Sequence, residues 1–172
     1  MRHSLEVAAW TLILGEKHLY DANQLPSVRK TREVGWRYAL FVAGWLHDVG
    51  KLVNGLRIWE TQTGSHWNPY RESILAWGQR LELKGYRYHW RSGRGTGHHR
   101  LNPLLMEPLL GPEAFAYLLD QGADLIQALT DALLGLSEER EIFPYLSKAD
   151  NQSAGNDMRC MARHATQGSG YA

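Results

Sequence analysis

Residues 45–51 have the sequence Trp-Leu-His-Asp-Val-Gly-Lys and close an apolar run that starts at Tyr38. The run is apolar on all sides, so a helix made from it must be buried all round. An imidazole and a carboxylate side by side at the end of that helix can both reach one divalent cation, and Gly50 lets the backbone turn away. Lys51 adds a positive charge that suits a phosphate. The same residues also suit an ordinary helix end, with His and Lys opposite the helix dipole and Gly at the cap.

The composition fits one globular domain. The chain has 172 residues, 44% of them hydrophobic, which is enough to build a core unaided. Lys and Arg total 19 against 18 Asp and Glu, so the net charge of +1 gives no overall attraction to polyanions, and any nucleic-acid surface must be local. The single Cys160 excludes an internal disulfide and fits a reducing compartment, so we expect a cytoplasmic protein. No stretch of the sequence reaches the length needed for membrane insertion.

The hydrophobic pattern predicts a mainly α fold with a small β-hairpin or β-arm. Spacings of three and four residues predict a helix from His3 to about Tyr20, and the polar, basic residues 21–33 predict a loop. Two-residue alternation predicts a strand over 86–91, and the shorter alternation over 56–59 fits either a strand or an irregular arm. Further helices are expected over 70–83, 98–109, 113–119, 124–134 and 144–163. Residues 1–165 then form the domain, and the small, polar residues 166–172 form a flexible tail.

Chemistry-bearing residues occur in a specific order along these elements: His3 in the first turn of the first helix, then His47-Asp48, then Asp150 on the last helix. This order resembles the HD superfamily of metal-dependent phosphohydrolases. Further stretches resemble the HD domain of MobH-type, TraI-like conjugative relaxases. They are Arg2-His3-Ser4-Leu5-Glu6-Val7-Ala8, Trp67-Asn68-Pro69, Tyr88-His89-Trp90-Arg91-Ser92-Gly93-Arg94 followed by His99, and Lys148-Ala149-Asp150-Asn151-Gln152-Ser153.

The resemblance implies an HD-domain-like helical bundle that nicks single-stranded DNA at the transfer origin of integrating conjugative elements and some plasmids. It also implies contact with the type IV secretion coupling machinery. Relaxases of this type usually carry a further histidine-containing segment before the position of His3 and a long C-terminal region. We therefore expect this chain to be an excised domain or a shortened family member.

The predicted ligands are His3, His47, Asp48 and Asp150. Imidazole and carboxylate groups suit a divalent ion such as Mn²⁺, Mg²⁺, Fe²⁺ or Ni²⁺ with positions open for water and substrate. Such an ion lowers the pKa of bound water and neutralises charge on a phosphoryl oxygen, and both effects favour phosphoester hydrolysis.

Other residues could assist this reaction. His98 and His99 would hold a second metal or grip the scissile phosphate, and His99 is favoured because it matches the family position; an exposed helix start is the alternative. Lys51 is predicted to contact phosphate as a mobile point charge.

Residues 80–100 contain the one local excess of basic charge. Arginines interleaved with aromatic residues suit a single-stranded DNA channel, through phosphate neutralisation and base stacking. Strict alternation would place the two kinds on opposite faces, and then the aromatic residues could be core. The predicted DNA contacts are Arg87, Arg91, Arg94, Arg100, Tyr88 and Trp90.

Three functions are compatible with these features. The leading hypothesis is a metal-dependent phosphodiesterase, a relaxase or nicking endonuclease acting on single-stranded DNA. The nearest alternative is an HD phosphohydrolase acting on nucleotides or cyclic dinucleotides. The third is a non-catalytic HD module that binds DNA or a partner protein. No motif identifies a tyrosine as a covalent nucleophile.

Overall fold

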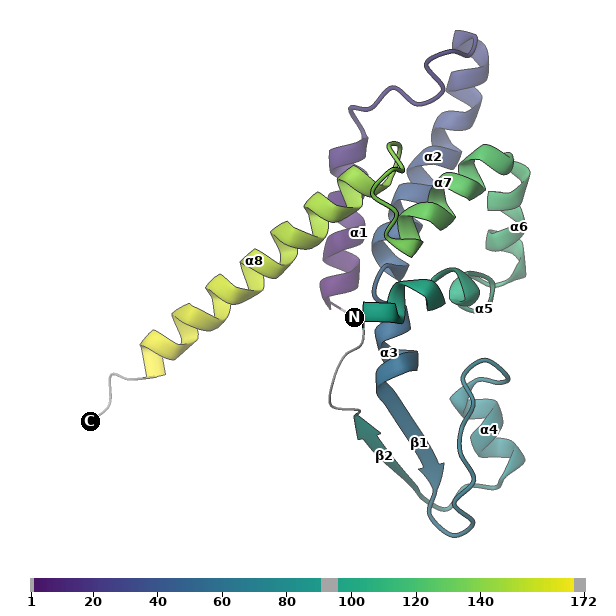
Figure 1. Cartoon of the computed structure of the whole chain (residues 1–172), viewed down its shortest axis with the longest axis vertical. Helices are drawn as coiled ribbons and strands as arrows, with labels where there is room; N and C mark the ends of the chain where they lie inside the picture. Colours follow the sequence, from purple (N-terminus) through teal and green to yellow (C-terminus); the bar gives the residue numbers. More distant parts are fainter. Residues whose placement is uncertain (1, 91–95, 169–172) are drawn as a thin grey trace.

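A computed structural model describes residues 2–90 and 96–168 and confirms the mainly α fold with a small two-stranded antiparallel sheet (Figure 1). The helices and strands are α1 (Arg2–Gly15), α2 (Pro26–Leu46), α3 (Val49–Gly55), β1 (Leu56–Glu60), α4 (Ile74–Arg80), β2 (Tyr86–Trp90), the 3₁₀ helices η1 (Thr96–Leu101) and η2 (Pro103–Leu105), α5 (Met106–Leu110), α6 (Pro112–Asp120), α7 (Ala123–Leu134) and α8 (Phe143–Gly168).

Helix α2 is the centre of the body. It packs against α1, α7 and α8, and α1 also packs against α8. The predicted apolar run forms the C-terminal half of α2, where Ala39, Leu40 and Leu46 are buried in the main core. A Cβ at Gly44 would overlap the backbone of Ala8, so this glycine lets α1 and α2 approach closely. The first turn of α1 therefore lies beside the end of α2, and α8 crosses α1.

The connection between α1 and α2 differs from the prediction. Helix α1 ends at Gly15 rather than near Tyr20, and α2 begins at Pro26, inside the predicted loop 21–33. Proline at the first helical position fits the start of α2. The basic residues Lys30 and Arg32 belong to the outer turns of this helix. The polar residues at the start of α2 form a helix surface, and we wrongly interpreted them as part of a loop.

The strands pair as a small arm that carries α4. Strands β1 and β2 are antiparallel, with Ile58 opposite Tyr88. Helix α4 begins after Ser73, whose hydroxyl accepts a hydrogen bond from the Ala76 N–H, so it starts later than the predicted Tyr70. Trp77 is the buried residue of this helix, whereas Ile74 is 40% exposed and Leu75 is 75% exposed.

The segment after β2 is not the single helix predicted over 98–109. Two 3₁₀ turns and the short α5 take its place. Pro103 and Pro108 lie inside the segment, and proline removes a backbone donor that a continuous helix needs. At the other end of the chain α8 continues to Gly168, beyond the predicted end near Arg163, and residues 169–172 of the predicted tail lie outside the described part.

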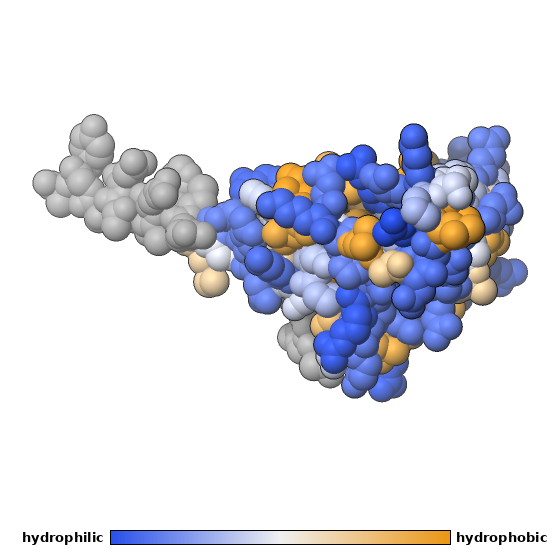
Figure 2. All heavy atoms as spheres, turned by 90° about the horizontal axis from the view of Figure 1, so that it is seen from above, coloured by the Kyte–Doolittle hydropathy of each residue, from blue (hydrophilic) through white to orange (hydrophobic). Residues whose placement is uncertain are grey.

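The upper face of the molecule is mostly hydrophilic, with scattered hydrophobic patches (Figure 2). Within the described ranges, no helix combines the length and the apolar character that crossing a bilayer requires.

Candidate metal centre

Four predicted ligands meet where α1, α2 and α8 come together. His3 lies in the first turn of α1, His47 and Asp48 form the break between α2 and α3, and Asp150 lies on α8. The break is local, because Asp48 has φ −112° and ψ 0° and α3 restarts at Val49. The chain therefore places two neighbouring side chains at the end of a buried helix and brings the others to them from distant segments.

The distances suit a shared cation. Ligand atoms of His3, His47 and Asp48 all lie within 4.8 Å of one another. Asp150 stands outside this mutually close trio, but its Oδ1 is 3.2 Å from His3 Nε2 and 3.4 Å from His47 Nε2. Asp48 Oδ2 is 3.8 Å and 3.5 Å from the same two nitrogens. Ligands about 2.1 Å from one ion are separated by about 3.0–4.2 Å, and these four contacts fall in that range.

A hydrogen bond to the backbone of α2 fixes the orientation of the His47 ring. The ring is buried, and Nδ1 lies 2.8 Å from the Gly44 carbonyl oxygen, which can only accept a hydrogen bond. The proton of a neutral ring is therefore on Nδ1 and the lone pair is on Nε2, facing the carboxylates. Nε2 is buried and has no hydrogen-bond partner in the described part of the chain. A buried nitrogen lone pair that faces two carboxylates suits a metal ion.

His3 is held by a residue whose role the sequence did not reveal. Its Nδ1 lies 3.0 Å from the hydroxyl oxygen of Ser153, which is fully buried. Ser153 follows Asp150 by three residues, so both face the same side of α8. This spacing is a signal in the sequence that could have identified Ser153.

The cluster favours positive charge. Burial lowers the pKa of His47, but the carboxylates of Asp150 and Asp48 more than offset that effect, so the pKa of this imidazole lies above its ordinary value. The pKa of Asp150 is lowered, chiefly by its interaction with His47. Carboxylates that stabilise an imidazolium would also stabilise a divalent cation in its place.

Lys51 contacts the same carboxylate. Its Nζ lies 2.6 Å from Asp48 Oδ2, the oxygen that faces His3 and His47. The Lys51 side chain is 41% exposed, so the ammonium stands at the edge of the cluster rather than inside it.

His98 and His99 also reach this region, from η1. His98 Nε2 is buried, has no hydrogen-bond partner among the described residues and lies 3.7 Å from Asp48 Oδ1. The other oxygen of Asp48 thus faces His98, while His99 stacks beside His98 with ring centroids 3.9 Å apart. Burial, followed by the electrostatic interaction with His98, lowers the pKa of His99 below its ordinary value.

A cavity of 230 Å³ adjoins the cluster. His47, His99 and Asp150 line one side of it, and the opposite walls include Leu133 and Phe143. It places a mostly apolar space directly beside the predicted ligands.

Three of the predicted DNA contacts, Arg87, Tyr88 and Trp90, lie on β2 of the arm. All five residues of β2 are exposed, and Tyr88 and Trp90 are 63% and 53% exposed, so the alternative that these aromatic residues are core is wrong. Arg87 lies on the opposite face of the strand, as the alternation requires. Arg100 is exposed on η1, whereas Arg91 and Arg94 lie outside the described residues.

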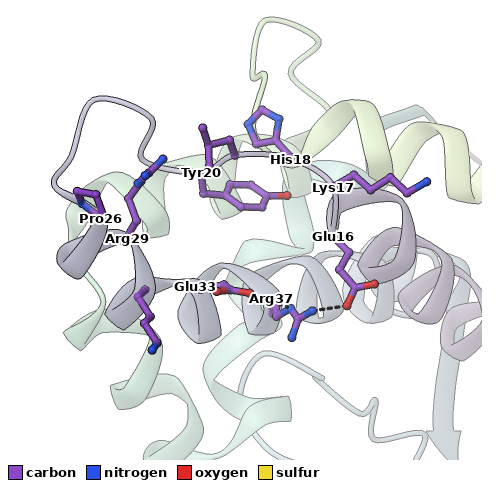
Figure 3. A pocket seen from close by; sticks show the side chains of 10 residues that line it. Glu16, Lys17, His18, Tyr20, Pro26, Arg29, Glu33 and Arg37 are labelled. Carbon is purple, nitrogen blue, oxygen red and sulfur yellow. Dashed lines mark hydrogen bonds and ion pairs between the residues drawn. The ribbon is translucent and has the colours of Figure 1, made fainter.

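A second hollow, of 410 Å³, lies between the α1–α2 connection and the N-terminal half of α2 (Figure 3). Its charges are mixed, and Arg37 pairs there with Glu16. His18 bonds to Glu141 and Tyr145 at its edge, which ties this connection to the start of α8. The hollow contains none of the predicted site residues, so the cluster is the candidate site.

Comparison with known proteins gives one match. The family model TraI_2, described as "Putative helicase", matches residues 1–172. No curated protein and no solved structure matches the chain.

Proposed function

The chain belongs to the TraI_2 family, and from this membership together with the His/Asp cluster we propose that it is a metal-dependent phosphodiesterase of the HD superfamily. Its substrate is single-stranded DNA at a conjugative transfer origin, and it acts as a MobH-type relaxase domain. Residues 1–165 form this domain. It works in the cytoplasm and delivers DNA to the type IV secretion coupling machinery.

The observation that carries the proposal is the buried Nε2 of His47, which lies between two carboxylates and has no hydrogen-bond partner in the ranges 2–90 and 96–168. A bound divalent ion, Mn²⁺ or another of the four candidates, would lower the pKa of water and neutralise charge on the phosphoryl oxygen. The Gly44 carbonyl keeps the His47 lone pair directed at the site, and the Ser153 hydroxyl bonds to His3 Nδ1, so that His3 Nε2 faces Asp48 and Asp150. Lys51 is close enough to the cluster to contact a phosphate that binds there.

His98 has a separate role in the proposal. Its Nε2, which has no hydrogen-bond partner among the described residues, and Asp48 Oδ1 would help to hold a second ion. His99 faces the cavity beside the cluster and grips the scissile phosphate or the group next to it.

The description of the family as a helicase has no support in the residues of this stretch. A phosphate-binding loop of an ATP-driven motor has the pattern GxxxxGK followed by Ser or Thr. The 172 residues contain one Gly-Lys pair, Gly50-Lys51, which is followed by Leu52 and lies in helix α3. These residues therefore favour hydrolysis of a phosphodiester over nucleotide-driven movement.

The arm supports DNA as the substrate. Exposed Tyr88 and Trp90 can stack on bases, while Arg87 and Arg100, with Arg91 and Arg94 between them in the sequence, neutralise phosphates. The register pairs Trp90 with Leu56, which directly follows α3, so the aromatic residues lead from the arm toward the cluster.

The alternative substrate, a nucleotide or cyclic dinucleotide, fits the cavity less well. At 230 Å³ the cavity is smaller than the roughly 300–1,000 Å³ of pockets that enclose small ligands. It suits one ring of a longer substrate whose remainder lies outside.

Cleavage of a labelled oligonucleotide tests the proposal. Protein loaded with Mn²⁺ is expected to cut single-stranded transfer-origin DNA, and His47→Ala to abolish cutting. His66→Ala is the matched control, because His66 forms a backbone β-bridge with Trp59 in the arm and is not one of the predicted ligands. Release of phosphate or mononucleotide from small substrates without oligonucleotide binding would favour the nucleotide hydrolase. Less than one ion per chain, with DNA affinity intact in His47→Ala, would favour the binding module.

A further inference from the structure

Asn102 is a fully buried polar residue between η1 and η2, and neither the motifs nor the proposed reaction uses it. A buried amide is costly unless its donors and acceptor are satisfied. Two of the bonds that satisfy Asn102 lead to the segment that carries His47 and Asp48, and the third leads to α7.

The side chain of Asn102 makes three hydrogen bonds. Nδ2 donates to the carbonyl oxygens of His47 and of Leu133, the latter at 3.1 Å, and Oδ1 accepts from the Gly50 N–H at 2.8 Å. The bonds to His47 and Gly50 bracket Asp48. One amide therefore fixes the backbone on both sides of the break that presents His47 and Asp48, and it anchors that break to α7.

The backbone of Asn102 connects to the other ligand-bearing segment. Its N–H donates to the His99 carbonyl at 3.2 Å. A Cβ at Gly50 would overlap the His98 carbonyl oxygen and lie 2.8 Å from Asn102 Oδ1, so η1 and α3 are in direct backbone contact here. The distance between Asp48 and His98 is set at this contact.

We propose that Asn102 is a positioning residue of the metal centre, which holds His47, Asp48 and His98 at the spacing that a shared cation needs. The inference rests on the metal centre of the proposed function. It explains why an amide is required: two carbonyl oxygens need donors and the Gly50 N–H needs an acceptor, and an asparagine side chain provides both.

Asn102→Asp is the most direct variant, because it keeps the size and the acceptor but replaces the two N–H donors with an oxygen that faces two carbonyls. Removal of residues that orient metal ligands typically lowers metal affinity about 10–100-fold. With Co²⁺ as the probe ion, we expect the metal affinity of Asn102→Asp to fall by this factor. The visible absorption spectrum of bound Co²⁺ should also change, because the ligand geometry would differ.

The control must separate positioning from general destabilisation. Leu118→Ala removes a fully buried core side chain on α6 that does not line the cluster or its cavity. This variant should lower the melting temperature yet keep the Co²⁺ affinity and spectrum of the wild type. Folded Asn102→Asp with wild-type affinity and spectrum would overturn the proposal.

A metal-free measurement covers the case in which Asn102→Asp does not fold. In the wild-type protein the Gly50 amide hydrogen should exchange with solvent as slowly as those of the core of α2, because Asn102 accepts its hydrogen bond. Rapid exchange at Gly50 would overturn the positioning role. Failure of the wild type to bind Co²⁺ with a protected Gly50 amide would instead refute the metal centre and leave the Asn102 hydrogen bonds intact.

Discussion

Gly50 has a different physical role from the one its sequence neighbours suggest. The motif predicted that glycine lets the chain turn away after Asp48, but Gly50 lies within α3 and is not among the glycines with positive φ. The space that a Cβ at residue 50 would need is occupied by the His98 carbonyl and the Asn102 side chain. Glycine is therefore required for the close approach of a second backbone, and nothing near residue 50 in the sequence reveals that requirement.

Replacement of Gly50 by alanine tests this role. We expect Gly50→Ala to lower the free energy of unfolding by about 1–3 kcal/mol, because the added methyl group must displace backbone. Mn²⁺ affinity should fall as well, since η1 and α3 would separate. Gly97→Ala in the same 3₁₀ segment is the control, because a Cβ there meets no atom within 4 Å. Equal urea midpoints and equal affinities for the two variants would contradict the account.

A change at Lys51 would separate the proposed metal binding from the proposed catalysis. Its ammonium pairs with the Asp48 oxygen that faces the cluster, so it repels a cation there and would attract a phosphate. Lys51→Ala should retain or increase Mn²⁺ affinity while reducing oligonucleotide cleavage at least about 10-fold, the effect of about 1.4 kcal/mol on the barrier. Lys148→Ala, an exposed lysine on α8, should leave both unchanged. Loss of Mn²⁺ binding in Lys51→Ala would exclude the phosphate-contact role.

At the scale of secondary-structure elements, the arm should account for part of the salt dependence of DNA binding. Arg87 is exposed on β2, and its removal should reduce the slope of log K against log[salt] by about 1. Arg80 on α4 is a matched control, because it is already paired with Glu72. Arg80→Ala should leave the slope unchanged. An unchanged slope for Arg87→Ala would remove β2 from the DNA interface.

The elements also show which parts of the fold were predictable. Helix α7, with its strong apolar periodicity, was placed within one residue at each end, and the start of α1 was placed equally well although its end was not. The alternation of β2 identified a strand. The first turns of α2 were missed because a helix with one solvated end is as polar as a loop. The prediction of one helix after β2 was wrong because prolines divide an otherwise helical pattern.

Across the whole molecule, the order of the predicted ligands could be read from the sequence, but the residues that hold those ligands in place could not. His3, His47, Asp48 and Asp150 could be selected from motif positions, and the structure brings them together. The residues that orient them, Ser153 and Asn102, act across 150 and 55 residues of sequence. Such contacts depend on how α1, α2, α7 and α8 pack, which spacing within one element cannot predict.

Because the predicted ligands come from three separate helical regions, the proposed metal binding requires the folded chain. A cation that binds only the folded state at 100 times its Kd contributes about 2.7 kcal/mol of stability. For a chain of this size that corresponds to a rise of about 5–10 °C in Tm. Saturating Mn²⁺ should produce this rise in the wild type and none in Asp48→Ala. An equal rise in both proteins would place the ion elsewhere.

We propose that His3, His47, Asp48 and Asp150 share one divalent cation. An anomalous-difference map from crystals containing Mn²⁺, collected at the manganese absorption edge, would locate this ion. We expect a peak within about 2.5 Å of ligand atoms from all four side chains. A map with full manganese occupancy elsewhere, or with no peak between His47 and Asp150, would contradict it.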